Sequence, residues 1–224
     1  MENLSMRIMA LSDFHGSSIA ADKAAKVAAS ETLDLLLIAG DLAFHSVESA
    51  SSILERLSNS KIPILFVPGN MDTMELTTYG YRGMSKCIHG KCERIGNCSF
   101  VGVGGAVKGP FMTPFESAEE EIHETLQRAV KNCEETKLVL VSHAPPKNTS
   151  VDLTRSGGHA GSSAVRKFIE TAQPILAICG HIHEARGTDR IGRTLILNPG
   201  PAQNWFYALI ELTDSADTKL LEFV

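Results

Sequence analysis

Continuous apolar runs alternate with helix-like stretches in the first third of the chain, and this alternation constrains the fold more than any other feature. Strand-like runs lie at residues 7–12, 33–40 and 62–69, and stretches with helical composition or period lie at 17–30 and 46–60. Runs of Leu, Ile and Val without polar alternation indicate strands covered on both faces. The resulting β-α-β-α-β order predicts a parallel sheet at the start of the chain.

The rest of the chain is predicted to be mixed α/β. We expect a hairpin at 92–106, a long amphipathic helix at 114–135, a buried strand at 136–143, a helix at 161–173 and a strand at 174–181. Three further runs, at 193–200, 206–212 and 219–224, are predicted to be mostly antiparallel strands. The chain has 224 residues, is 43% hydrophobic and shows no linker or repeat. Residues 1–224 are therefore expected to form a single domain.

Charge and composition narrow the classes of function. The formal net charge of -5 argues against stable docking on nucleic acid. No apolar run reaches the roughly 18 residues needed for a membrane span, and no signal peptide is recognisable. Five cysteines, an odd number, predict reduced thiols and a cytoplasmic location. The sequence leaves the oligomeric state open.

Polar side chains follow each of the buried strands directly. The carboxyl ends of strands in an open α/β sheet form the usual ligand crevice, so these side chains are expected to converge. Carboxylate, imidazole and amide groups are metal ligands, and seven of them are enough for two ions that share one carboxylate. The seven candidate ligands are Asp13, His15, Asp41, Asn70, His143, His181 and His183.

The charges of this set suit phosphate chemistry. Asp13 and Asp41 bring two negative charges, whereas the Asn and the four His are neutral as ligands. Two divalent ions would leave a net charge of about +2, which attracts phosphate and lowers the pKa of a bound water.

The segments DFH, GD, GNMD, SHAPP and GHIH, in this order, resemble the signature of calcineurin-like metallophosphoesterases, from Ile8 to about Phe206. The later stretches look like the small Icc-like phosphoesterases of archaea and bacteria. The resemblance implies an α/β fold, a four-layer αββα sandwich with two mixed sheets flanked by helices. It implies two divalent ions, and Mn, Fe, Zn, Ni or Co would suit these ligands. One ion would be held by Asp13, His15, Asp41 and His183, and the other by Asp41, Asn70, His143 and His181.

Met71 departs from the family pattern. The family usually has Gly-Asn-His followed by an acidic residue, and the His serves the transition state or the leaving oxygen. Losing a general acid lowers a rate by about 10² to 10⁴. Asn70 and Asp72 are retained as candidate catalytic residues. Relatives without the His tend to favour phosphodiesters, so the resemblance implies a phosphodiesterase, with some monoester activity possible, in which a hydroxide held by the ions attacks phosphorus.

Other readings stay open at this point. His159, in the Gly-rich segment GGHAG, is a candidate to replace the missing His, and Arg155 is a candidate ligand for a phosphate oxygen. A small phosphate ester is the expected substrate. His159 could equally be a residue that packs at the entry of the next helix. The whole protein could also be a binding scaffold with an eroded site, or a nuclease.

Overall fold

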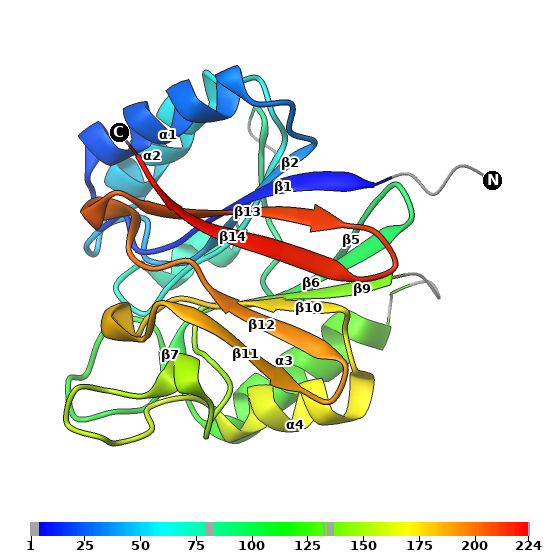
Figure 1. Ribbon diagram of the computed structural model, residues 1–224. Coiled ribbons are helices and arrows are strands. Elements are labelled where there is room, and N and C mark those ends of the chain that lie inside the picture. The colour runs from blue at the N-terminus through cyan, green and yellow to red at the C-terminus, as the bar shows by residue number, and fades with distance from the viewer. Residues whose placement is uncertain (1–4, 79–82, 132, 134–136, 224) are drawn as a thin grey trace.

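The computed structural model describes residues 5–78, 83–131, 133 and 137–223, which are arranged in four layers (Figure 1). The first sheet has the strand order β14-β13-β1-β2-β3-β4. Strands β1 to β4 run parallel to one another, as the β-α-β-α-β pattern predicts. At one edge β13 pairs antiparallel with β1, and β14 pairs antiparallel with β13. The bounds are β1 Met6–Leu11, β2 Leu35–Ala39, β3 Ile64–Val67, β4 Ser85–Cys87, β13 Phe206–Leu212 and β14 Ala216–Glu222.

The second sheet has the order β11-β12-β10-β9-β6-β5. Its four inner strands are parallel, and both edge strands are antiparallel to their neighbours. The bounds are β5 Cys92–Ile95, β6 Cys98–Val103, β9 Lys137–Ser142, β10 Leu176–Ile178, β11 Gly187–Ile191 and β12 Thr194–Asn198. A separate parallel pair consists of β7 Ala106–Val107 and β8 Glu116–Ser117.

Helices cover the outer faces of both sheets (Figure 1). The first sheet is covered by α1 Ser18–Ser30 and α2 Val47–Ser58, and the second by α3 Glu119–Lys131 and α4 Ser163–Ala172. Side chains of Ser17, Ser46 and Ser162 cap the amino ends of α1, α2 and α4, which satisfies backbone N–H groups that the helix itself leaves unbonded. Short 3₁₀ helices span Met74–Thr78, Ser150–Asp152, His183–Ala185 and Ala202–Asn204.

Three clusters of buried apolar side chains fill the spaces between adjacent layers. The middle one fills the space between the sheets with side chains such as Leu37, Phe100 and Ile178, all fully buried. The other two lie between each sheet and its helices. Burying one such side chain contributes about 1.5–3 kcal/mol. The predicted αββα sandwich with two mixed sheets is therefore confirmed.

Some element boundaries differ from the predictions. The helix expected from residue 114 begins at Glu119, because residues 116 and 117 pair with β7 instead. The expected end of that helix, at 132 and 134–135, lies outside the described residues. Strands β4 and β11 were not predicted, since β4 is only three residues long and β11, GTDRI, is largely polar. None of the helices in the described ranges is long and apolar enough to cross a membrane.

The prediction that all thiols are reduced is wrong for one pair. Cys92, on β5, and Cys133, after α3, form a disulfide with their Cα atoms 5.7 Å apart. The antiparallel β5–β6 hairpin and the packing of α3 against β6 bring together two residues 41 positions apart in sequence. Cys87, Cys98 and Cys179 are free and buried.

Candidate metal centre

The loops after β1 and β2 bring Asp13 and Asp41 together. The backbone N–H of Asp13 donates to Gly40 O at 2.9 Å, and that of His15 donates to Asp41 O at 2.9 Å. These bonds continue the parallel pairing of β1 and β2 beyond the last strand residues. The predicted convergence of side chains at the strand ends therefore begins with backbone hydrogen bonding between neighbouring loops.

The second sheet contributes His143 and His181 across the interface. His181 N donates to both carboxylate oxygens of Asp13, at 3.3 and 3.2 Å, and Gly180 N donates to His143 O at 3.0 Å. A Cβ atom on Gly180 would overlap Ser12 Oγ, and one on Gly69 would overlap Asp41 Oδ1. Only glycine therefore allows the loops to approach this closely.

Four of the seven candidate ligands have an unusual backbone conformation. The φ angles are 55° for Asp13, 47° for His15, 53° for Asp41 and 69° for His181. Left-handed conformations in residues other than glycine cost about 1–3 kcal/mol each where they are strained, and they concentrate at functional sites. The surrounding hydrogen bonds hold these residues in place.

The side chains of Asp13, His15 and His183 form the first of two clusters. Each residue offers a ligand atom within 4.8 Å of those of the other two. His183 Nε2 is 3.4 Å from Asp13 Oδ1 and 3.2 Å from His15 Nε2. His15 Nε2 is also 3.6 Å from Asp41 Oδ2, so Asp41 borders this cluster. The structure thus brings together the residues of the first predicted ligand set, and their binding of an ion stays a prediction.

The second cluster contains Asp41 and His143, with Asn70 and His181 beside them. Asp41 Oδ2 lies 3.5 Å from His143 Nε2, and Asn70 Oδ1 lies 2.9 Å from the same nitrogen. The rings of His143 and His181 have centroids 5.1 Å apart. Asp13 also falls within this cluster. Asp41 therefore lies between the two groups of histidines, as a bridging carboxylate would.

Hydrogen bonding around His143 shows that the second cluster suits a cation. Nδ1 of His143 lies 2.7 Å from the carbonyl oxygen of Ala39, so it must carry the proton and donate it. Nε2 faces the oxygens of Asn70 and Asp41, so without a metal ion it must carry a second proton, and a divalent ion there would take the place of that proton. The residues present therefore fit a divalent ion.

The same crowding of oxygens perturbs the pKa values of the buried groups. Burial lowers the pKa of His143, but the carboxylates of Asp41 and Asp13 outweigh it and raise the pKa to about 9. Burial raises the pKa of Asp13, but the hydrogen bond from His183 and the charge of His143 lower it to about 2. Burial lowers the pKa of His181 to about 4, which keeps that imidazole neutral and available as a ligand near pH 7.

The Asp72 carboxylate accepts hydrogen bonds from the backbone of two neighbouring loops. It accepts from the N–H groups of Leu42, Ala43 and Gly69 at 3.0, 2.9 and 2.8 Å. Burial and the nearby charge of Asp41 raise its pKa to about 7. These contacts hold the backbone of the loop that carries Asp41, so Asp72 helps to position a candidate ligand.

Met71 occupies the position where the family motif has His. Its backbone is anchored, because Met71 N donates to Asp41 Oδ1 at 2.8 Å and Met71 O accepts from His45 N at 2.9 Å. The thioether side chain is half-buried and has no proton to donate.

A cavity of about 290 Å³ opens beside the centre. Asn70, His159 and His181 are among the residues that line it. The Nδ1 atom of His159 lies 2.7 Å from Oδ1 of Asp152, which is fully buried. Burial raises the pKa of Asp152, but hydrogen bonds from Thr149 N, His159 and Gly161 N lower it below its usual value. His159 is therefore held at the cavity by a buried carboxylate.

Arg155 lies outside the group of residues that line this cavity. Its backbone N–H donates to Glu184 Oε1 at 3.0 Å, and its side chain is exposed. A role for Arg155 in binding phosphate stays a prediction.

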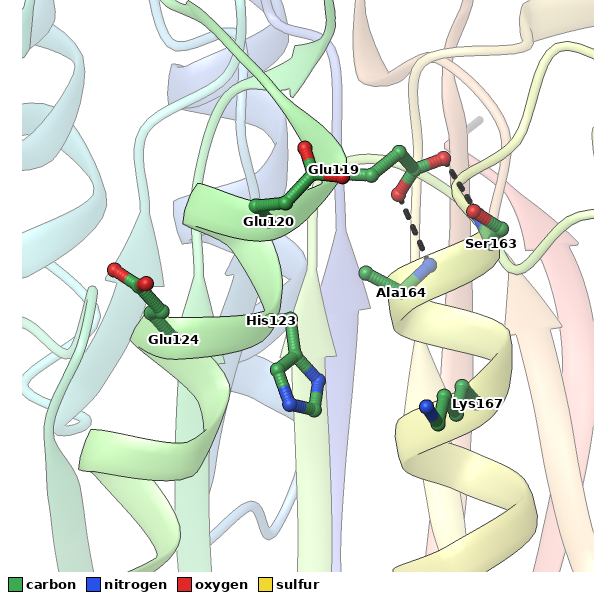
Figure 2. A pocket seen from close by; sticks show the side chains of 7 residues that line it. All are labelled: Glu119, Glu120, His123, Glu124, Ser163, Ala164 and Lys167. Atoms are coloured by element: carbon green, nitrogen blue, oxygen red, sulfur yellow. Dashed lines mark hydrogen bonds between the residues drawn. The ribbon is translucent and has the colours of Figure 1, made fainter.

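A larger hollow of about 370 Å³ lies between α3 and α4 (Figure 2). His123, Glu120 and Glu124 line it on α3, and Lys167 lines it on α4. It contains none of the predicted metal ligands, and size alone does not identify the reactive site.

Sequence reasoning missed several side chains around the cavity. Thr113 accepts from Asn70 Nδ2 at 3.1 Å and donates to Glu116 Oε1 at 2.7 Å, so it orients the Asn70 amide with Oδ1 toward His143. The ring of Phe44 stacks on His15 with centroids 4.8 Å apart. Asp152, Lys108 and Lys147 were also missed. They belong to no recognisable motif, and only the folded chain brings Lys108 and Lys147 to the cavity and Asp152 to His159.

The chain belongs to the calcineurin-like phosphoesterase superfamily, whose domain profile matches residues 6–214. It is 37% identical over 208 residues to an uncharacterized protein of Methanocaldococcus jannaschii, a match that covers 90% of this chain and 91% of the other. This membership confirms the resemblance found in the sequence motifs.

Two solved structures share the fold. A Thermus thermophilus protein, TT1561, has a TM-score of 0.77 at 18% identity, and the match covers 99% of this chain and 100% of the other. A dimetal phosphatase from Danio rerio has a TM-score of 0.68 at 11% identity, with 98% and 96% covered. At these identities the likeness concerns the fold alone.

Proposed function

We propose that this protein is a dinuclear metal-dependent phosphodiesterase that acts on small phosphate esters. The observation that carries the proposal is the convergence of Asp and His side chains into two adjoining clusters around Asp41, next to a cavity, with Met71 in the position of the family's catalytic His. The centre therefore has the proposed metal ligands that would bind phosphate, but at position 71 it lacks the His that would protonate a poor leaving group.

The proposed ligand sets share Asp41. Asp13, His15 and His183 complete the first set, and Asn70, His143 and His181 complete the second. Two divalent ions held there would supply Lewis-acid stabilisation of the phosphoryl oxygens and a water of lowered pKa. We propose manganese as the first ion to test, and we keep a cytoplasmic location as a prediction.

The chain's own residues position the reaction. Thr113 fixes the Asn70 amide, and Asp72 holds the backbone of the Asp41 loop. The mixed walls of the cavity admit an organic substituent beside the centre. A diester carries one negative charge at phosphorus, so it needs less charge compensation than a monoester dianion.

His159 is the proposed proton donor for the leaving oxygen. His159 lines the same cavity as Asn70 and His181, and the buried carboxylate of Asp152 accepts from Nδ1. When Nδ1 is bonded in this way, Nε2 is left to carry and deliver a proton. His159 would therefore replace, from another loop, the donor that is missing at Met71.

Hydrolysis of bis(p-nitrophenyl) phosphate and of p-nitrophenyl phosphate, each with added Mn²⁺, tests the proposal. We expect clear turnover of the diester and much less of the monoester. Equal or faster hydrolysis of the monoester would refute the diester preference. No hydrolysis of either ester would favour a binding scaffold.

Two variants test the ligand assignment. His181→Ala and Asp41→Asn should abolish the metal-dependent rate, because each removes a ligand of the second set. His123→Ala is the matched control, since His123 lies on α3 in the other hollow. Full rates in either ligand variant would show that the assignment is wrong.

A further inference from the structure

Two lysines, from separate segments of the chain, line the cavity that adjoins the metal centre. Lys147 follows the segment after β9, and Lys108 follows β7. Both line the cavity together with Asn70 and His181. Among the described residues, no carboxylate lies within 4.0 Å of either ammonium group.

The backbone beneath both lysines is fixed. Lys147 N donates to Ser162 O at 3.0 Å, and Lys147 O accepts from the Arg166 guanidinium at 2.8 Å. Lys108 N donates to Ser117 O at 3.1 Å, which continues the β7–β8 pairing. Hydrogen bonds therefore hold the backbone of both lysines in place, although both residues are exposed.

The two carboxylates in the cavity wall are already engaged elsewhere. Glu116 accepts from Gly109 N, Thr113 N and Thr113 Oγ1 at 3.0, 2.8 and 2.7 Å. Glu119 turns toward the start of α4, where it accepts from Ser162 Oγ at 2.6 Å. It also accepts from Ser163 N and Ala164 N at 2.8 and 2.9 Å, as Figure 2 shows. Both carboxylates keep their negative charge, but these hydrogen bonds direct them to protein N–H and O–H groups, whereas the two lysine ammonium groups have no such carboxylate partner in the described part of the chain.

We propose that Lys108 and Lys147 form a subsite for a second phosphate group, so that the natural substrate is a phosphodiester that carries a terminal phosphate as well. This inference rests on the proposed function. A phosphate monoester has a charge of about -1.5 to -2 near pH 7, which two ammonium groups match, whereas a carboxylate would need only one. Lysine binds phosphate as a compact point charge.

Dinucleotide probes separate this subsite from the metal centre. The holoenzyme with Mn²⁺ is given TpT, pTpT or TpTp, which share one diester and differ only in a terminal phosphate. An exposed ion pair is worth up to about 1 kcal/mol, or about fivefold, so the two lysines together give about 25-fold. We expect kcat/KM to be about 25-fold higher for pTpT or TpTp than for TpT.

Neutral variants test whether the lysines cause the preference. Lys108→Gln and Lys147→Gln should each reduce the preference about fivefold and leave kcat/KM for TpT and for bis(p-nitrophenyl) phosphate unchanged. Lys167→Gln, in the hollow between α3 and α4, is the matched control and should behave as the wild type.

The possible failures are distinguishable. Equal rates for TpT and both phosphorylated probes would overturn the subsite and leave the diesterase standing. If both Lys→Gln variants keep the full preference for pTpT or TpTp over TpT, the terminal phosphate binds elsewhere. That result would also overturn the subsite. No hydrolysis of any diester would refute the proposed function and this inference with it.

Discussion

Breaking the Cys92–Cys133 disulfide is predicted to destabilise the fold without affecting the metal centre. The bridge closes a loop with a sequence separation of 41 residues. In the chain-entropy model, a loop of this length restricts the unfolded state enough to stabilise the fold by about 4 kcal/mol. The unfolding entropy of a 224-residue chain near 60 °C is about 0.47 kcal/mol per kelvin, so the loss corresponds to a fall in Tm of about 8 °C.

Differential scanning calorimetry of the wild type and a Cys92→Ser, Cys133→Ser double variant measures this effect. The reductant supplies an internal control, because it should lower the Tm of the wild type and leave that of the double variant unchanged. Thiol titration of the unfolded, unreduced wild type should give three free thiols, those of Cys87, Cys98 and Cys179. Five titratable thiols, or equal Tm values for the two proteins, would refute the reasoning.

Three further predictions concern single side chains. Burial and the charge of Arg128 lower the pKa of His89 from 6.5 to about 4, so its contribution to stability is present above pH 6.5 and is lost as pH falls toward 4. With a chelator present, urea unfolding measures the free energy of unfolding at pH 7 and at pH 5. Between these values the wild type should lose about 2 kcal/mol more than His89→Asn does; equal losses in the two proteins would contradict this. His159→Ala should lower the kcat for diesters with poor leaving groups about 10²-fold and change p-nitrophenyl esters little; a uniform loss would indicate a structural role. Met71→His should raise the hydrolysis of phenyl phosphate, a monoester whose leaving oxygen needs a proton, at least tenfold relative to p-nitrophenyl phosphate; an unchanged ratio would mean that the residue at this position does not assist the leaving oxygen.

The residue pattern was sufficient for the buried strands and for the convergence of the candidate ligands, whereas the four-layer arrangement was implied by the resemblance to the family. Apolar runs such as 33–40 are long enough to mark strands buried on both faces, and parallel strands necessarily direct their carboxyl ends to one side. Asp13, Asp41 and His143 were therefore expected to meet, and they do. Whether these side chains bind metal stays a prediction.

Other features depend on contacts between distant segments and leave no local signal. The Cys92–Cys133 bridge arises because α3 packs beside the β5–β6 hairpin, and the odd number of cysteines pointed the other way. Asp152 reaches His159 only because the loop between β9 and α4 folds back on itself. Strand β11 has three consecutive polar residues, Thr188, Asp189 and Arg190, and lies at an edge, so it lacks the apolar run by which the central strands were recognised.

Anomalous diffraction at the manganese edge, from crystals grown with Mn²⁺, tests the metal centre most directly. We predict two peaks about 3.5–4 Å apart, with the Asp41 carboxylate between them. Asp13, His15 and His183 should surround one peak, and Asn70, His143 and His181 the other. A single peak, or peaks away from these side chains, would contradict the dinuclear centre on which the proposed activity depends.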